Sequence, residues 1–152
     1  MPPHILIAAD HGGFADKQTL KDFLEQQGYS VEDCGPATLD PNDDYPQIVA
    51  SVAAKMADAA PDTRVILLCR SGAGMSMATN RFPYLRAVTA LNEEQARHAR
   101  NDEDANVLSL SADWLTQVEQ EAIVTKFLTT PCSTEERHAR RIAQLSKLGT
   151  SP

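Results

Sequence analysis

Short apolar stretches alternate with longer amphipathic stretches along most of the chain, and this alternation constrains the fold more than any other feature of the sequence. Runs such as Val65–Leu68 are continuously apolar, which is typical of strands that are covered on both faces. Right-handed helical crossovers between parallel strands provide such cover. The sequence therefore predicts an α/β fold: a doubly wound, five-stranded parallel sheet with helices on both faces and a C-terminal helix.

The periodicity also gives bounds for each expected element. We expect strands at His4–Ala9, Tyr29–Cys34, Arg64–Cys69, Leu85–Ala90 and Asn106–Leu110. We expect helices at Phe14–Gln27, Pro46–Ala60, Met75–Arg81, Glu93–Arg100 and Leu115–Leu128. Parallel sheets bind ligands beyond the carboxyl ends of their strands, so three segments are expected to share one crevice: Ala9–Gly13, Cys69–Gly74 and the turn after Ala90.

With 152 residues, the chain is long enough for one domain and too short for two ordinary enzyme domains. We assign residues 1–132 to the α/β domain and residues 133–152 to a helical tail, with a single domain overall. Within that tail, Ser133–Leu148 could continue as a helix. A terminal helix outside the alternating pattern needs a surface to pack on, either its own domain or another subunit, and we favour a dimer.

Composition excludes several classes of partner. Acidic residues outnumber basic ones by 21 to 14, and the formal net charge of −7 argues against a nucleic-acid or anionic-membrane partner. No apolar run is long enough to span a bilayer, so a cytoplasmic location is expected. The three cysteines, Cys34, Cys69 and Cys132, form no C-x-x-C pair, which disfavours both a disulfide framework and a zinc site.

The strongest local signal is the segment from Cys69 to Gly74, which follows a buried strand and precedes a helix. Gly72 and Gly74 allow backbone N–H groups to turn towards one point, where they could hold an anion. Cys69 lies where the strand ends and could serve as a nucleophile or a base. Taken alone, however, a free cysteine is more often a small buried apolar residue.

Two other groups of residues could join this loop. Asp10 and His11 follow the first strand and lie at the same edge of the predicted sheet, although Asp10 could simply cap the next helix and His11 could be solvated. Arg137, His138 and Arg141 belong to the densest positive cluster of the chain, and the two arginines stand one helical turn apart, as two ligands of one phosphate would. The alternative for this cluster is an exposed face of salt bridges.

Together these residues resemble the ribose-5-phosphate isomerase B family, which includes the galactose-6-phosphate isomerase subunits. The resemblance covers nearly the whole chain. It is carried by five motifs in order: Ala9-Asp10-His11-Gly12-Gly13, Asp44-Tyr45-Pro46, Cys69-x-Ser71-Gly72-x-Gly74-Met75-Ser76 with Asn80, Asp104-Ala105-Asn106-Val107-Leu108, and Arg137-His138-Ala139-Arg140-Arg141.

The resemblance implies a Rossmann-like homodimer, with active sites at the subunit interface, that interconverts an aldose phosphate and a ketose phosphate without metal or organic cofactor. Cys69 would be the base, and the Ser71–Gly74 backbone would stabilise the developing oxyanion. Ser71 would orient the thiol or a substrate hydroxyl, Asp10 would assist ring opening or hold sugar hydroxyls, and Tyr45 would pack along the sugar. The phosphate would be bound by side chains that come in part from the partner chain, namely His11, Arg137, His138 and Arg141.

The chain departs from the family pattern at the expected site. Arg70 stands where typical members have glycine, and it would narrow the mouth of the loop and add a positive contact. Asp102 and Glu103 stand where typical members have His-Asn, so ring opening would fall to Asp10 or Asp102, with Glu103 near the sugar. His98, one helical turn before Asp102, could supply an imidazole, although a surface histidine is the plainer interpretation.

We predict an isomerase of ribose 5-phosphate and ribulose 5-phosphate. The alternatives are an isomerase of another sugar phosphate, such as allose 6-phosphate, galactose 6-phosphate or a tetrose phosphate, and a non-catalytic subunit that binds sugar phosphates.

Overall fold

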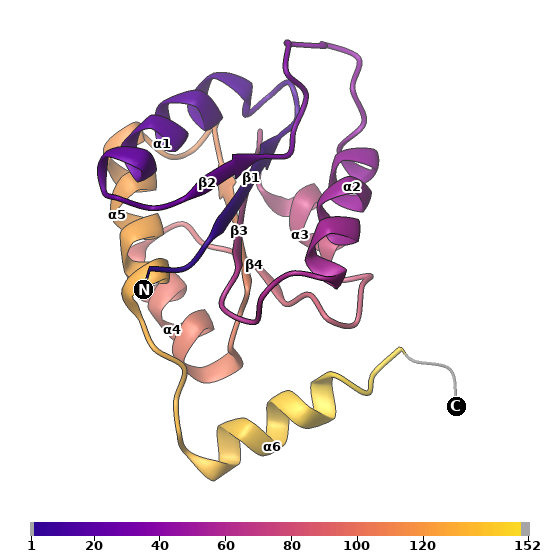
Figure 1. Ribbon diagram of the computed structural model, residues 1–152, viewed down its shortest axis with the longest axis vertical. Helices are drawn as coiled ribbons and strands as arrows, with labels where there is room; N and C mark the ends of the chain where they lie inside the picture. Colours follow the sequence, from indigo (N-terminus) through magenta and orange to yellow (C-terminus); the bar gives the residue numbers. More distant parts are fainter. Residues whose placement is uncertain (1, 150–152) are drawn as a thin grey trace.

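The computed structural model describes residues 2–149 and confirms the doubly wound α/β fold (Figure 1). Met1 and residues 150–152, the outer ends of the two predicted regions, lie outside the described residues. The strands are all parallel and pair in the order β2-β1-β3-β5-β4. Their bounds are β1 Ile5–Ala9, β2 Val31–Asp33, β3 Arg64–Cys69, β4 Ala87–Thr89 and β5 Val107–Ser111.

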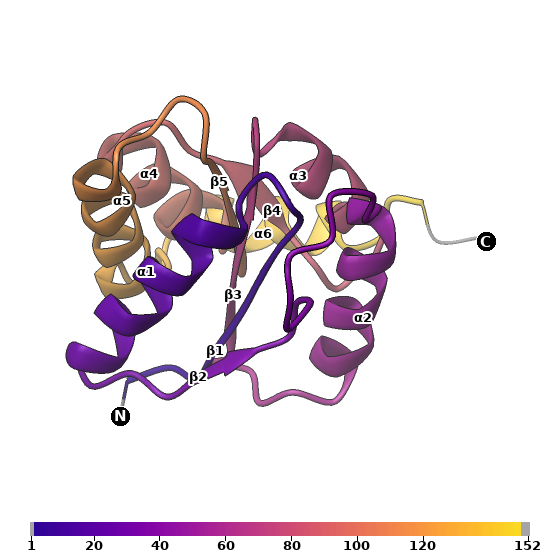
Figure 2. The same ribbon diagram turned by 90° about the horizontal axis from the view of Figure 1, so that it is seen from above.

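Helices cover both faces of this sheet (Figure 2). The helices are α1 Phe14–Gln26, α2 Tyr45–Ala57, α3 Ala73–Thr79, α4 Glu93–Glu103, α5 Gln117–Thr129 and α6 Glu136–Leu145. Helices α1, α4 and α5 lie on one face, and α2 and α3 lie on the other. The side chains of β1 alternate between the two cores, Ile5 and Ile7 on the first face and Leu6 on the second, because successive strand residues point to opposite sides.

The two edge strands are half as long as expected, and α2 ends at Ala57, three residues earlier than expected. β2 and β4 each have three residues, where six were expected, because each pairs with one neighbour only. Helix α3 begins at Ala73, two residues earlier than expected, after Gly72 adopts a left-handed conformation with φ of 78°. Helix α4 continues to Glu103, three residues further than expected, and ends where Asp104 turns left-handed.

The strand order changes which loops meet at the carboxyl edge of the sheet. β5 lies between β3 and β4, so the segment after β5 lies against the end of β3. The backbone N–H groups of Ala112 and Asp113 donate to the carbonyls of Cys69 and Arg70 at 2.9 and 3.0 Å. The segment beginning at Ala112 therefore joins this edge beside Cys69. That the turn after Ala90 shares the same crevice stays a prediction: β5 lies between β4 and β3, but Thr89 at the end of β4 reaches the loop and donates to the Gly72 carbonyl.

Helix α6 stands apart from the other layers (Figure 1). It lies at the amino edge of the sheet, beyond an extended connection, and it packs against α4. The connection is tied to the end of α4, since Ser133 N–H donates to the Asn101 carbonyl at 2.8 Å. Among residues 2–149, no helix has both the length and the apolar character needed to cross a membrane.

Candidate active site

Cys69 lies at the last position of β3, at the carboxyl edge of the sheet, with 5% of its surface exposed. The backbone N–H of Gly72 donates a hydrogen bond to the Cys69 Sγ at 3.1 Å. Such a contact would also stabilise a negative charge on the sulfur. A side chain at Gly72 would place its Cβ 2.9 Å from the Thr89 Cγ2, so both the backbone conformation and the space require glycine.

Hydroxyl groups from two other strands hold the Gly72 carbonyl. Ser109 Oγ donates to it at 2.7 Å and Thr89 Oγ1 donates at 3.1 Å. Next to it, Ser71 Oγ accepts the Ala73 N–H at 3.2 Å. Because buried hydrogen bonds of this kind hold a loop in one conformation, the N–H groups around Cys69 are preorganised.

Arg70 covers the neighbouring loop. A Cβ on Gly12 would lie 2.3 Å from the Arg70 Cγ, so glycine is needed beneath the arginine stem. The Arg70 Nε donates to Asp113 Oδ2 at 3.1 Å, and Ser111 Oγ donates to the Arg70 carbonyl at 2.6 Å. The stem of Arg70 therefore lies over Gly12, and its guanidinium has an aspartate partner that sequence reasoning missed; its contact with a substrate stays a prediction.

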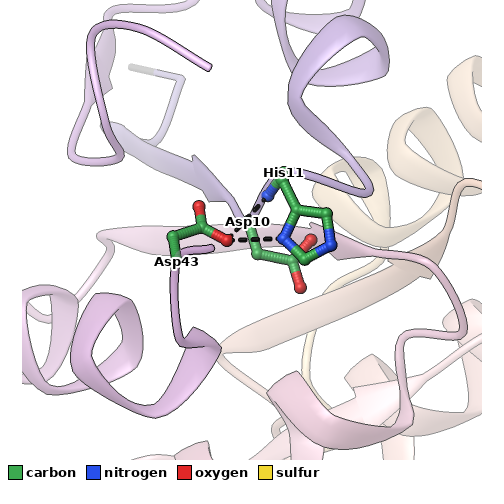
Figure 3. A group of neighbouring side chains, drawn as sticks. All are labelled: Asp10, His11 and Asp43. Atoms are coloured by element: carbon green, nitrogen blue, oxygen red, sulfur yellow. Dashed lines mark hydrogen bonds and ion pairs between the residues drawn. The ribbon is translucent and has the colours of Figure 1, made fainter. Parts of the chain in front are cut away.

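Asp10, His11 and Asp43 form a cluster beside this loop (Figure 3). The Asp10 Oδ1 accepts the N–H groups of Gly12 at 2.9 Å and Gly13 at 3.3 Å, so it organises its own loop rather than capping α1, whose N-cap is Gly13. Asp43 Oδ1 lies 2.7 Å from His11 Nδ1. Burial raises the pKa of Asp10, and the hydrogen bond to Asp43 raises the pKa of His11.

The spacing of this cluster is close enough for a metal ion, since ligand atoms of Asp10, His11 and Asp43 lie within 4.8 Å of one another. However, His11 Nδ1 and Asp43 Oδ1 are already hydrogen-bonded to each other, and the Asp10 Oδ1 is used by two backbone N–H groups. A metal ion would have to break these bonds before using those atoms. The cluster is better described as a hydrogen-bonded network than as a set of metal ligands.

Tyr45 completes the carboxyl-edge group. It is the first residue of α2, and its ring lies against Gly74 on α3, where an added Cβ would be 2.9 Å from the Tyr45 Cζ. The structure thus places eight predicted site residues at one edge of the sheet, held mainly by backbone contacts: Asp10, His11, Tyr45, Cys69, Arg70, Ser71, Gly72 and Gly74. We refer to them as the carboxyl-edge group.

The remaining predicted residues lie at the opposite edge of the sheet. Asp102 and Glu103 end α4 before β5 begins, whereas Cys69 pairs with Ser111 at the end of β5. The five residues of β5 span about 13 Å, so within one chain these acidic residues lie more than a strand's length from the thiol. Arg137, His138 and Arg141 lie on α6 beside α4 and complete this second set, which we call the amino-edge group.

Asp102 lies between two histidine side chains. Its Oδ2 lies 2.9 Å from His98 Nδ1, and its Oδ1 lies 3.9 Å from the buried His138 Nδ1, which has no hydrogen-bond partner among the described residues. His138 therefore faces α4, while Arg137 and Arg141 are exposed. As a phosphate ligand, His138 stays a prediction.

Part of the arginine cluster forms surface salt bridges, which was the alternative interpretation of this cluster. Arg137 Nε lies 2.7 Å from Glu135 Oε2, and Arg140 Nη1 lies 2.9 Å from Glu136 Oε2. A groove of about 370 Å³ runs between β4 and the end of α6, with Glu103 and Leu145 in its lining. The amino-edge group thus combines exposed charge with an open groove.

Sequence reasoning missed four residues that hold the carboxyl-edge group: Asp43, Thr89, Ser109 and Asp113. Asp43 precedes the Asp44-Tyr45-Pro46 motif, and Ser109 is a polar residue within an apolar strand, so both left a weak signal. The other two cysteines are not part of the site. Burial raises the pKa of Cys34 to about 11 and also raises that of Cys132, so both remain thiols at neutral pH.

Comparisons with known proteins find relatives over nearly the whole chain. The Ribose/Galactose Isomerase family matches residues 5–145. The ribose-5-phosphate isomerase B of Mycolicibacterium paratuberculosis is 38% identical over 144 residues, which cover 94% of this chain and 89% of that protein. The probable ribose-5-phosphate isomerase B of Mycoplasma pneumoniae is 38% identical over 141 residues, which cover 93% of this chain and 91% of that protein.

Solved structures give the same result. The ribose-5-phosphate isomerase B of Mycoplasma genitalium, crystallised with bound ribulose-5-phosphate, superposes with a TM-score of 0.90 at 36% identity and covers 96% of this chain and 95% of its own. The type B ribose 5-phosphate isomerase of Trypanosoma brucei superposes with a TM-score of 0.89 at 33% identity and covers 96% and 98%. The likeness therefore extends over the entire fold.

Proposed function

The chain belongs to the ribose/galactose isomerase family, and we propose that it interconverts the aldose and ketose forms of a phosphorylated sugar. Ribose 5-phosphate and ribulose 5-phosphate are the leading pair, because the relatives are named for this reaction and one of them is crystallised with ribulose-5-phosphate. An isomerase of another sugar phosphate, such as allose 6-phosphate, galactose 6-phosphate or a tetrose phosphate, remains the alternative.

The observation that carries this proposal is the position of the Cys69 sulfur, buried at the carboxyl edge of β3 and hydrogen-bonded to the Gly72 N–H. As the base, the thiolate takes the proton from carbon 2 of the open-chain aldose. The electron pair moves towards the carbonyl oxygen on carbon 1 and forms an enediolate. The hydroxyl proton on the oxygen of carbon 2 passes to the oxygen of carbon 1, and Cys69 returns its proton to carbon 1, so a ketone forms at carbon 2 without any net redox change.

The other carboxyl-edge residues support the same step. The backbone N–H groups of the Ser71–Gly74 loop stabilise the enediolate oxygen, and the Ser71 hydroxyl orients the thiol or a substrate hydroxyl. Asp10, whose raised pKa favours proton exchange nearer neutral pH, assists ring opening or holds sugar hydroxyls. Tyr45 packs along the sugar.

The separation of the two groups supports a homodimer with active sites at the interface. One chain by itself keeps Arg137 and Arg141 away from Cys69, so a second copy would have to supply them to the phosphate. Beside the amino-edge group, at the end of α6 and just after it, Leu145 and Leu148 are 43% and 69% exposed. They provide an apolar surface for such a contact. Asp102 and Glu103 would then reach the sugar from the same second copy.

The substrate depends on what replaces His-Asn of the family pattern. With Asp102 and Glu103 at these positions, ring opening falls to Asp10 or Asp102, or is not needed if the substrate is an acyclic tetrose phosphate. Arg70, over the mouth of the site, would contact a further anionic or hydroxyl group of the substrate.

The test is an NMR or coupled assay of the purified protein against ribose 5-phosphate, allose 6-phosphate, galactose 6-phosphate and erythrose 4-phosphate. We expect conversion of ribose 5-phosphate, and we expect Cys69→Ala and Cys69→Ser to lower kcat by about 10²- to 10⁴-fold, the contribution typical of a positioned base, with binding retained. Full activity in either variant would exclude Cys69 as the base.

Solvent deuterium exchange into the sugar phosphate separates catalysis from mere binding. An enediolate intermediate exchanges its carbon-bound proton with solvent, so deuterium should appear at carbon 1 or carbon 2 in the wild-type protein and not in Cys69→Ala. Tight binding without exchange across the whole panel would instead indicate a non-catalytic subunit that binds sugar phosphates.

A further inference from the structure

Asp43 contacts both the backbone and the side chain of His11. The Asp43 Oδ1 accepts the backbone N–H of His11 at 3.1 Å and lies 2.7 Å from the Nδ1 of the same residue. The Asp43 side chain is 11% exposed, whereas the His11 side chain is 37% exposed. The carboxylate is therefore largely enclosed, and the histidine it holds remains open to a ligand.

This double contact fixes the orientation of the imidazole. A carboxylate oxygen only accepts, so the Nδ1 of His11 must carry the proton that it donates to Asp43. The backbone contact from the same oxygen ties the ring to its own main chain. The nitrogen directed away from Asp43 is then Nε2, and Figure 3 shows the ring beside the carboxyl group of Asp10.

The charges around His11 act in both directions. Asp43 raises the pKa of His11 mainly through the hydrogen bond, and the nearby negative charge of Asp10 raises it further. The positive charge of Arg70 opposes this effect. The net effect is a raised pKa, so the His11 ring binds its second proton more readily than a free imidazole does, and an imidazolium donates a charge-assisted hydrogen bond to a phosphate.

The segment that brings Asp43 to His11 is anchored on the scaffold. The Asp43 N–H donates to the Asp40 carbonyl at 3.2 Å, which closes a turn just before α2. Further back, the buried Lys17 Nζ donates to Asp33 Oδ1 at 3.0 Å and to the Pro36 carbonyl at 3.3 Å. The loop between β2 and α2 thus delivers Asp43 next to Tyr45 in a defined position.

We infer that Asp43 is a positioning residue, which fixes His11 with Nδ1 protonated and Nε2 directed at the phosphate of the substrate. This inference rests on the proposed function for the identity of the anion. The tautomer and the ring orientation are properties of the free protein. They can be measured even if no sugar phosphate is converted.

The variant that separates charge from contact is Asp43→Asn, because an asparagine oxygen can still accept both N–H groups but carries no charge. The matched control is Asp40→Asn. It removes one negative charge from the same loop, and the Asn42 N–H that Asp40 Oδ1 accepts keeps an acceptor. The readouts are kcat and KM between about pH 5.5 and pH 9, and the inhibition constant of inorganic phosphate.

We expect Asp43→Asn to raise KM and the phosphate inhibition constant by about tenfold near neutral pH. The reason is that the hydrogen bond from His11 to the phosphate is no longer charge-assisted once the ring has lost its anionic partner. We expect kcat to change by less than about twofold. The pKa of His11 is raised in the wild type, so phosphate binding weakens as pH rises through this pKa. In Asp43→Asn this loss should begin at lower pH, and in Asp40→Asn it should not move.

Nitrogen NMR of the His11 ring in the wild-type protein gives a second, independent test. At pH values where the ring is neutral, we expect the proton on Nδ1. A proton on Nε2 would overturn the inference, as would an Asp43→Asn variant with unchanged KM, phosphate inhibition and pH profile. If Asp43→Asn does not fold, the tautomer in the wild type still decides. A correct tautomer with no isomerase activity would count against the proposed function alone.

Discussion

The two edges of the sheet are built in different ways. At the carboxyl edge, Cys69 and its loop are held by buried backbone groups and by hydroxyls from β4 and β5. At the amino edge, Arg137 and Arg141 lie exposed on a helix that packs on α4, and the connection that leads to this helix from α5 is hydrogen-bonded to the end of α4. The groups at the carboxyl edge are held in place by the chain itself. The amino edge instead presents exposed charge, exposed apolar surface and a groove, to which a further protein surface could bind.

The largest expected effect comes from mixing two impaired variants, one without the Cys69 thiol and one without the Arg137 guanidinium. If the two groups meet across a dimer interface, a Cys69→Ala chain paired with an Arg137→Ala chain contains one site with both native residues. After subunit exchange, we expect an equal mixture to recover about a quarter of wild-type activity, since half of the dimers are mixed and each has one intact site.

The control for the mixing experiment is each variant alone, taken through the same subunit-exchange procedure. Activity that does not rise after verified subunit exchange would mean that Cys69 and Arg137 act within one chain. In that case, α6 would have to move a strand's length, and the comparison of the two edges would lose its meaning for catalysis.

A second prediction concerns how firmly the carboxyl edge is anchored. Lys17 is fully buried and pairs with Asp33, which is 24% exposed. Lys17→Met leaves Asp33 without its cation, and we expect the free energy of unfolding to fall by roughly 2–3 kcal/mol, somewhat below the cost for a fully buried pair. Chemical denaturation followed by circular dichroism measures this change.

The matched control for that prediction is Lys21→Met on the same helix. Lys21 pairs with Glu25 one turn away at the surface, so its replacement should leave stability almost unchanged. Equal effects of the two substitutions would show that burial of Lys17 does not anchor the β2–α2 loop.

The smallest expected effect is at the mouth of the site. Arg70 is an exposed side chain paired with Asp113, and Arg70→Gly restores the glycine typical of the family. We expect KM for the preferred substrate to rise by less than about fivefold, because an exposed ion contact contributes little in water. Steady-state kinetics over the sugar-phosphate panel measures it, with Lys21→Met as the charge-matched control. A change of preferred substrate would make Arg70 a specificity residue.

Local sequence patterns predicted much of the fold and the positions of two residues of the carboxyl-edge group. The five parallel strands, the alternating helices and the positions of Asp10 and Cys69 at strand ends all follow from periodicity and from where each motif stands. In proportion to its length, each edge strand was predicted least accurately, because the length of an edge strand depends on how much of it a neighbour pairs with.

The partners that hold the site could not be read from the sequence. His11 and Asp43 are 32 residues apart, and Arg70 and Asp113 are 43 residues apart, so no local pattern links them. The order of the strands is equally remote from local signals. It places β5 next to β3 and brings Ser109 within 2.7 Å of the Gly72 carbonyl.

The sequence by itself determined the fold class, the family and the chemical groups available to the site. Hydrophobic periodicity, turn residues and motif spacing are local properties and survive without knowledge of what packs where. Only the tertiary structure decided that these groups divide between two edges of the sheet, that Asp43 holds His11, and that His138 faces Asp102. These outcomes depend on strand order and on contacts between distant segments, which are set by the packing of the whole chain rather than by any stretch of it.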